Sequence, residues 1–65
     1  MPKRYTSKEL IKIVEADEWY LVNSEGSHHQ FRHKTKKGRV TIEHPRKEML
    51  PKTANRILKQ AGLKK

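Results

Sequence analysis

The first helical pattern in the chain begins at Thr6, within TSKELIKIVEADEW. Thr6 is followed three positions later by Glu9, which is the pattern of a capping box, where each side chain binds a backbone N–H at the start of a helix. Apolar residues then recur at helical spacing: Leu10, Ile13 and Val14, with Ile11 beside them. We therefore expect a helix over about Ser7–Asp17.

Three segments that follow have the features of β-strands. WYLVNS (Trp19–Ser24) is rich in aromatic and branched residues, shows no helical period and is followed by turn residues. The segment Ser27–Lys34 is predicted as a second strand and Arg39–His44 as a third, in which apolar and polar residues alternate. TKKG (Thr35–Gly38) lies between them and predicts a hairpin turn.

The last pattern, PKTANRILKQAGL, predicts a second helix that Gly62 ends. Its apolar residues lie on one helical face: Ala54, Ile57, Leu58 and Ala61. The predicted order is thus α-β-β-β-α in a single domain spanning residues 1–65. Two helices on one face of a three-stranded antiparallel sheet would bury the apolar faces, giving an α+β fold whose other sheet face is open.

Alternation along the second strand decides which residues lie on that open face. Phe31 is the large apolar residue of this strand, and if it points inward, His29 and His33 share its face. The opposite face then carries His28, Gln30, Arg32 and Lys34, next to Arg39, Thr41 and Glu43 of the third strand. We expect His29 and His33 to pack or to form local hydrogen bonds, and Trp19 to belong to the core.

Charge narrows the classes of partner. Sixteen Lys and Arg against seven Asp and Glu give the 65-residue chain a net charge of +9, which favours RNA, DNA or an acidic protein. No basic helix with bulky apolar anchors indicates a membrane surface. The chain has no cysteine and no apolar run long enough for a signal peptide or a membrane span, so we expect a cytoplasmic protein.

His28 is the candidate for catalysis. Histidine gives and takes protons at neutral pH, which RNA cleavage requires at the 2′-hydroxyl and at the leaving oxygen. Gln30, Arg32, Lys34 and Arg39 are the predicted RNA-binding residues beside it. An exposed histidine in a basic strand can also simply contact phosphate or solvent. His28 and His29 point to opposite sheet faces and cannot bind one metal ion together, so we expect neither a metal nor another cofactor.

Several of these motifs together resemble the HicA family of toxin mRNA interferases. The similarity covers nearly the whole chain and rests on the helix KELIKIVEADEWYLV, the strand GRVTI followed by His44-Pro45, and the closing ILKQAGL. It also rests on a GSH-x-x-F signature: Gly26, Ser27, His28 and Phe31. The family often has a proline where this chain has Glu43 and a glycine at a position comparable to Glu18.

The resemblance implies a fold similar to the double-stranded RNA-binding domain, cleavage of mRNA that arrests translation and growth, and neutralisation by a HicB-type antitoxin. It also implies that His28 is the catalytic residue. A second proton-transfer group is needed, and His44, a lysine or water are the candidates; His44 is alternatively a turn residue. Two other functions remain open: an RNA-binding module without catalysis, and a basic domain that binds an acidic protein.

Overall fold

The computed structural model describes residues 4–63. Its elements follow one another as α1 (Ser7–Ala16), β1 (Tyr20–Glu25), β2 (His28–Arg32), β3 (Val40–Glu43) and α2 (Pro51–Gln60). The strands form one sheet in the order β1-β2-β3, and both pairings are antiparallel. The predicted α-β-β-β-α order and the α+β class are confirmed.

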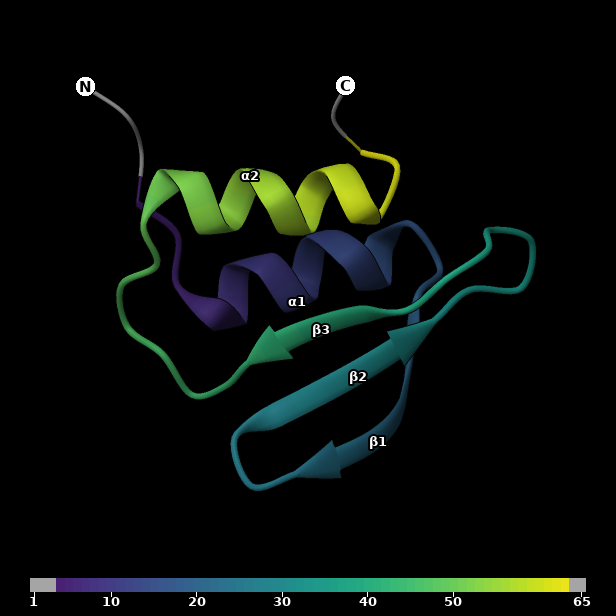
Figure 1. Cartoon of the computed structure of the whole chain (residues 1–65), viewed down its shortest axis with the longest axis horizontal. Coiled ribbons are helices and arrows are strands. Elements are labelled where there is room, and N and C mark those ends of the chain that lie inside the picture. Colours follow the sequence, from purple (N-terminus) through teal and green to yellow (C-terminus); the bar gives the residue numbers. More distant parts are fainter. Residues whose placement is uncertain (1–3, 64–65) are drawn as a thin grey trace.

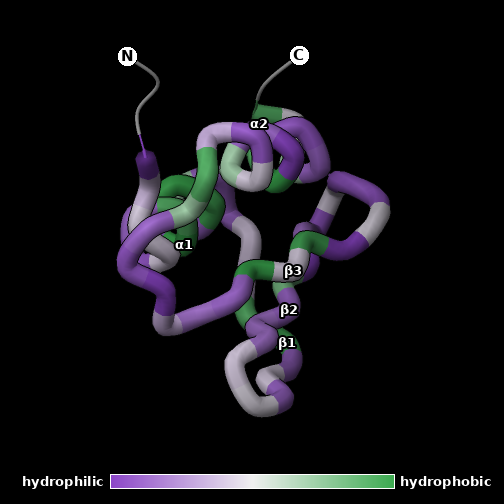
Figure 2. The backbone as a smooth tube through the Cα atoms, turned by 60° about the vertical axis from the view of Figure 1, so that its left-hand side comes forward, coloured by the Kyte–Doolittle hydropathy of each residue, from purple (hydrophilic) through white to green (hydrophobic). Residues whose placement is uncertain are grey.

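The helices and the sheet meet at β3. Figures 1 and 2 show both helices on the β3 side of the sheet and β1 farthest from them. The core joins both helices to the inward residues of β2 and β3: Leu10, Val14, Trp19, Phe31, Val40, Ile42, Met49, Ala54, Ile57, Leu58 and Ala61. Every residue of β1 is exposed. Trp19 lies in the core, as predicted.

Helix α1 begins at the predicted capping box. The Glu9 backbone N–H donates to Thr6 Oγ1 at 3.1 Å, and the Thr6 backbone N–H donates to Glu9 Oε1 at 2.9 Å. Leu10 and Val14 are fully buried, but Ile13, which we expected on the same apolar stripe, is 36% exposed. The buried face of α1 is therefore narrower than the sequence pattern indicated.

Glu18 follows the C-cap residue of α1, Asp17, and has a φ of 74°. A side chain in this left-handed region crowds the backbone, whereas glycine adopts it freely. The left-handed backbone at Glu18 thus explains why the HicA-like pattern often has a glycine near this position.

We predict that Glu18→Gly stabilises the protein by about 1 kcal/mol, because it removes left-handed strain. Chemical denaturation at equilibrium measures the change. Glu18→Ala is the control, since it removes the same charge but keeps a β-carbon in the strained conformation. Equal stabilisation by both variants would assign the effect to charge and contradict the prediction.

The connection between β2 and β3 is longer than the predicted turn, because β2 ends at Arg32. The side chain of His33 is only 8% exposed and its Nε2 lies 2.6 Å from the backbone oxygen of Asp17. Its Nδ1 accepts hydrogen bonds from the backbone N–H groups of Thr35 and Lys36, at 3.1 and 3.2 Å. These bonds turn the chain away from the sheet and confirm the local hydrogen-bonding role expected for His33.

Lys36 ties this loop to both helices. Its Nζ donates to the Asp17 carboxylate and to the backbone oxygen of Ala61, the latter at 2.9 Å. The hydrogen bond from Lys36 lowers the pKa of the Asp17 carboxyl below its usual 3.8, against a smaller opposing effect of desolvation. The loop between β2 and β3 is thereby attached to the ends of α1 and α2.

The lowered pKa predicts how acid acts on stability. A carboxyl whose pKa is lower in the folded state stabilises the fold above its unfolded-state pKa, and this contribution disappears as the pH falls through the folded-state value. We expect Asp17→Asn to lower the urea midpoint at pH 7, and its difference from the unsubstituted protein to shrink below about pH 4. Glu15→Gln on the exposed side of α1 is the control. A difference that stays constant down to pH 2 would contradict this role.

Helix α2 ends at the predicted glycine. Gly62 has a φ of 73°, its N–H donates to the oxygen of Lys59, and the N–H of Leu63 donates to the oxygen of Leu58 at 2.9 Å. This pair of bonds is a Schellman motif, which uses glycine for its left-handed residue. Gly62 and these two hydrogen bonds therefore end the helix.

Candidate active site

The β1-β2 hairpin places His28 at the first position of β2. Glu25 pairs with His28 across the hairpin, which leaves Gly26 and Ser27 as its turn. Gly26 has a φ of 57°, the conformation that a type II′ turn requires at its first central residue. The backbone oxygen of Ser27 accepts a hydrogen bond from His44 N–H at 2.7 Å and extends the pairing with β3. The glycine and the serine of the GSH motif thus fix the position of its histidine.

The two faces of the sheet divide as alternation predicts. Phe31, Val40 and Ile42 are buried between the sheet and the helices. On the outer face, His28 pairs with Glu43, and Gln30 pairs with Thr41. Arg39 donates to Gln30 Oε1 at 2.7 Å, which joins two of the predicted RNA-binding residues on this face.

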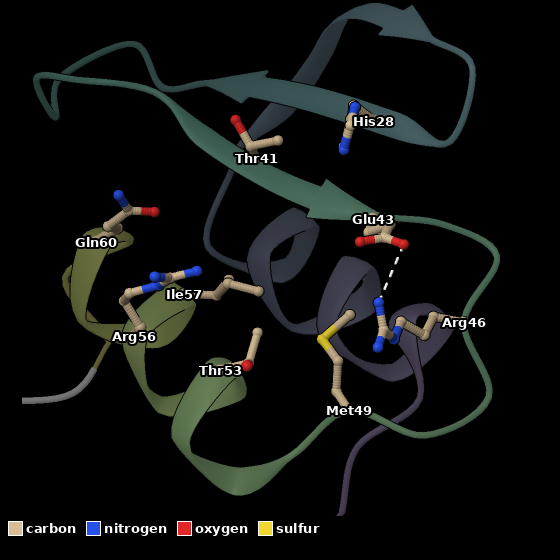
Figure 3. A pocket seen from close by; sticks show the side chains of 9 residues that line it. All are labelled: His28, Thr41, Glu43, Arg46, Met49, Thr53, Arg56, Ile57 and Gln60. Atoms are coloured by element: carbon tan, nitrogen blue, oxygen red, sulfur yellow. Dashed lines mark hydrogen bonds and ion pairs between the residues drawn. The ribbon is translucent and has the colours of Figure 1, made fainter.

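The outer face is not an open plane at His28, because α2 forms a second wall there. A pocket of about 360 Å³ lies between the sheet and α2, within the size range of small-ligand sites. Figure 3 shows His28, Thr41 and Glu43 on the strands, and Arg56 and Gln60 on α2 opposite them. The lining residues are His28, Thr41, Glu43, Arg46, Met49, Thr53, Arg56, Ile57 and Gln60.

The charged groups of the pocket differ in whether they are neutralised. Arg46 Nη1 lies 3.0 Å from Glu43 Oε1, and the two form an ion pair. The side chain of Arg56 is exposed and makes no ion pair or hydrogen bond with any other residue in the range 4–63. The pocket therefore presents an imidazole, a paired carboxylate and an unpaired guanidinium.

His44 does not share this pocket. Its Nδ1 lies 2.6 Å from Oγ of Ser7, which is only 1% exposed. Ser7 Oγ accepts the Arg46 backbone N–H at 2.8 Å, so this buried hydroxyl contacts both His44 and Arg46. The His44 ring meets the His29 ring edge-on, with the ring centres 5.2 Å apart. Of the two roles considered for His44, the structure supports the structural one.

Comparison with known proteins identifies the family. The sequence profile described as the HicA toxin of bacterial toxin–antitoxin systems matches residues 7–63. The chain belongs to the HicA toxin family. Comparison with curated protein sequences gave no match. Family membership makes this domain a toxin of a bacterial toxin–antitoxin system, and the match covers every element that forms the pocket.

The other predicted site residues of this HicA-family domain lie outside the pocket. Gln30 and Arg39 are neighbours on the outer face, and Arg32 is exposed at the end of β2. Lys34 is not on the sheet, because β2 stops before it and it lies exposed in the loop 33–39. The expectation that Lys34 shares a strand face with His28 was wrong, since the hydrogen bonds of His33 redirect the chain.

Two arginines of the pocket were missed in the sequence. Arg56 lies off the apolar face of α2, and a signal was present: PKTANRILKQ has three basic residues and no acidic one. Arg46 gave no such signal, because its position depends on the bond between its backbone and Ser7.

Two further observations concern the described residues. No three His, Asp or Glu side chains between residues 4 and 63 converge as a metal site would require. Within the same range, neither helix has the length and apolar character to cross a membrane.

Proposed function

We propose that this HicA-family toxin is an endoribonuclease that cleaves mRNA without a metal ion and thereby inhibits translation and growth. The observation that carries the proposal is the position of His28, in a pocket with a carboxylate and two arginines. Imidazole and carboxylate are the groups that acid–base chemistry uses, and arginine binds phosphate. Membership of a toxin family supports a cellular role in which this chemistry is harmful.

The proposed reaction divides two proton transfers between His28 and Glu43. Glu43 takes the proton of the 2′-hydroxyl, whose oxygen attacks the phosphorus atom. His28 gives a proton to the departing 5′-oxygen, so that the strand is cut and a 2′,3′-cyclic phosphate is left. Glu43 is suited to this role because it pairs with His28 across β2 and β3 and lines the same pocket. No lysine lies among the lining residues, and His44 is bound to Ser7.

We predict that Glu43→Gln lowers kcat for RNA cleavage by about 100-fold, the usual size of one acid–base contribution. Binding of RNA should not weaken, since the variant removes a negative charge. Single-turnover cleavage and fluorescence anisotropy separate the two effects. Glu25→Gln is the matched control, because Glu25 is the other cross-strand partner of His28 and does not line the pocket. Equal losses in both variants would contradict the assignment of Glu43.

The outer face of the sheet extends the proposed RNA site beyond the pocket. Gln30 and Arg39 present hydrogen-bond donors next to Thr41, and Arg32 lies farther along β2. We retain these three residues, and Lys34 in the adjacent loop, as candidates for contacts with RNA outside the reacting nucleotides.

The proposed partner is a HicB-type antitoxin that covers His28. The net charge of +9 predicts an acidic surface on this partner. Adding the antitoxin should suppress cleavage in proportion to complex formation. A stable complex that still cleaves RNA at the original rate would exclude masking of the active site.

The test of the proposed activity uses purified protein and a long single-stranded RNA in the presence of a chelator. Fragments should accumulate at the same rate with and without the chelator. The same RNA with 2′-deoxy nucleotides should bind but remain intact, because the nucleophile is missing. RNA that binds and is never cut would favour the non-catalytic RNA-binding module instead.

A further inference from the structure

The exposed face of α2 carries a row of positive charge whose central member, Arg56, also lines the pocket. Lys52, Arg56 and Lys59 are exposed, and their spacing places them along one side of the helix. Together with Thr53 and Asn55 they line a second hollow on α2. Arg56 and Thr53 line both this hollow and the pocket of His28, so the two adjoin.

Within residues 4–63, the charge of this row is not neutralised by ion pairs. Helix α2 contains no acidic residue, and no residue from 4 to 63 forms an ion pair with Lys52, Arg56 or Lys59. The lysine of the loop 33–39 that reaches α2, Lys36, is by contrast paired with Asp17. Unpaired cations beside a catalytic pocket favour an anionic ligand that extends out of it.

We propose that α2 holds the RNA backbone: Arg56 binds the phosphate next to the reacting one, and Lys52 and Lys59 bind neighbouring phosphates. This inference rests on the proposed function and names the surface that aligns its substrate. Lys52 and Lys59 are seven residues apart and therefore lie about 10 Å apart along the helix axis. Long basic side chains spaced along this row can contact successive phosphates of one RNA strand. Guanidinium suits the central position because it binds a phosphate through two parallel hydrogen bonds.

The geometry favours RNA over an acidic protein as the ligand of this row. Arg56 lies on the pocket wall opposite His28, so it can contact an RNA strand whose reacting phosphate lies at His28 (Figure 3). The neighbouring side chains, Thr53 and Gln60, can donate hydrogen bonds to phosphate or sugar oxygens.

The test compares Arg56→Gln with a control on the other helix. A single-stranded RNA oligonucleotide is titrated by fluorescence anisotropy in a His28→Ala background, and kcat/KM is measured with His28 intact. We expect Arg56→Gln to weaken RNA binding and to lower kcat/KM, each by about tenfold, and to reduce the slope of log K against log salt by about 0.7. Arg56→Lys should have an RNA affinity between that of Arg56→Gln and that of the protein with Arg56 intact. The double variant Lys8→Gln/Lys12→Gln, on the exposed side of α1, should change binding little although it removes more charge.

The outcomes separate this inference from the proposed function. Cleavage by the unsubstituted protein with no effect of Arg56→Gln would overturn the α2 site and leave the ribonuclease in place. Binding that depends on Arg56 without any cleavage would support the α2 site and remove the ribonuclease. An equal loss of RNA binding in the α1 control would show that affinity depends only on the net charge of the protein, and would overturn the inference. Unchanged RNA affinity with weaker binding of poly-glutamate would assign the row to an acidic protein instead.

Discussion

His28→Ala should abolish RNA cleavage and the arrest of bacterial growth while the domain stays folded. His28 is exposed on the outer face of β2, and substitutions at such positions usually change stability by less than about 0.5 kcal/mol. In the proposed reaction the same side chain protonates the leaving oxygen, and its loss should slow cleavage by about 10²–10⁴-fold. Growth after induction measures the toxic effect, RNA decay measures cleavage, and thermal denaturation measures the fold.

His29→Ala is the matched control for this variant. His29 is the adjacent histidine, but it is partly buried on the inner face and meets His44 rather than the pocket. This variant should retain most of the cleavage activity even if it is somewhat less stable. Loss of cleavage in His29→Ala with an active His28→Ala would reverse the assignment of the two sheet faces.

Phe31→Ala should have the largest effect on stability. Phe31 is 1% exposed and is among the largest fully buried side chains of the core. Truncating a buried phenylalanine costs about 3–5 kcal/mol, whereas a domain of this size has a total stability on the order of 3–10 kcal/mol. We expect the variant to be largely unfolded at 37 °C and therefore inactive.

Two further variants are the controls for Phe31→Ala. Phe31→Leu should fold with reduced stability and recover cleavage, because it restores part of the buried volume. Tyr20→Ala removes an aromatic side chain that is 47% exposed and should cost far less stability than Phe31→Ala. A free energy of unfolding of Phe31→Ala within about 1 kcal/mol of that of the unsubstituted protein, measured by chemical denaturation, would show that Phe31 is not central to the core.

Local chemistry made most of the fold predictable from the sequence. Thr6 and Glu9 mark the start of α1 because both groups of a capping box lie within one turn. Gly62 marks the end of α2 because the left-handed turn that ends a helix depends only on residues next to it in the sequence. Phe31 fixes the register of β2, since strand alternation depends only on which side chain must be buried.

The pocket was less predictable because it depends on contacts between distant segments. Arg56 becomes part of it only through the packing of α2 beside β3, which no local pattern of α2 specifies. Arg46 is placed by a hydrogen bond from its backbone to Ser7, at the other end of the domain sequence. Lys34 was placed on the wrong element, because the bonds of His33 to Asp17 and to the loop are also long-range or irregular.

The chemical ends of the RNA fragments test the proposed catalysis most directly. The unsubstituted protein, incubated with single-stranded RNA and a chelator, should produce fragments that end in a 2′,3′-cyclic phosphate. This end forms when the 2′-hydroxyl is the nucleophile, as the proton transfers of His28 and Glu43 require. Fragments that end in a 3′-hydroxyl, or cleavage that the chelator stops, would contradict the metal-independent acid–base mechanism.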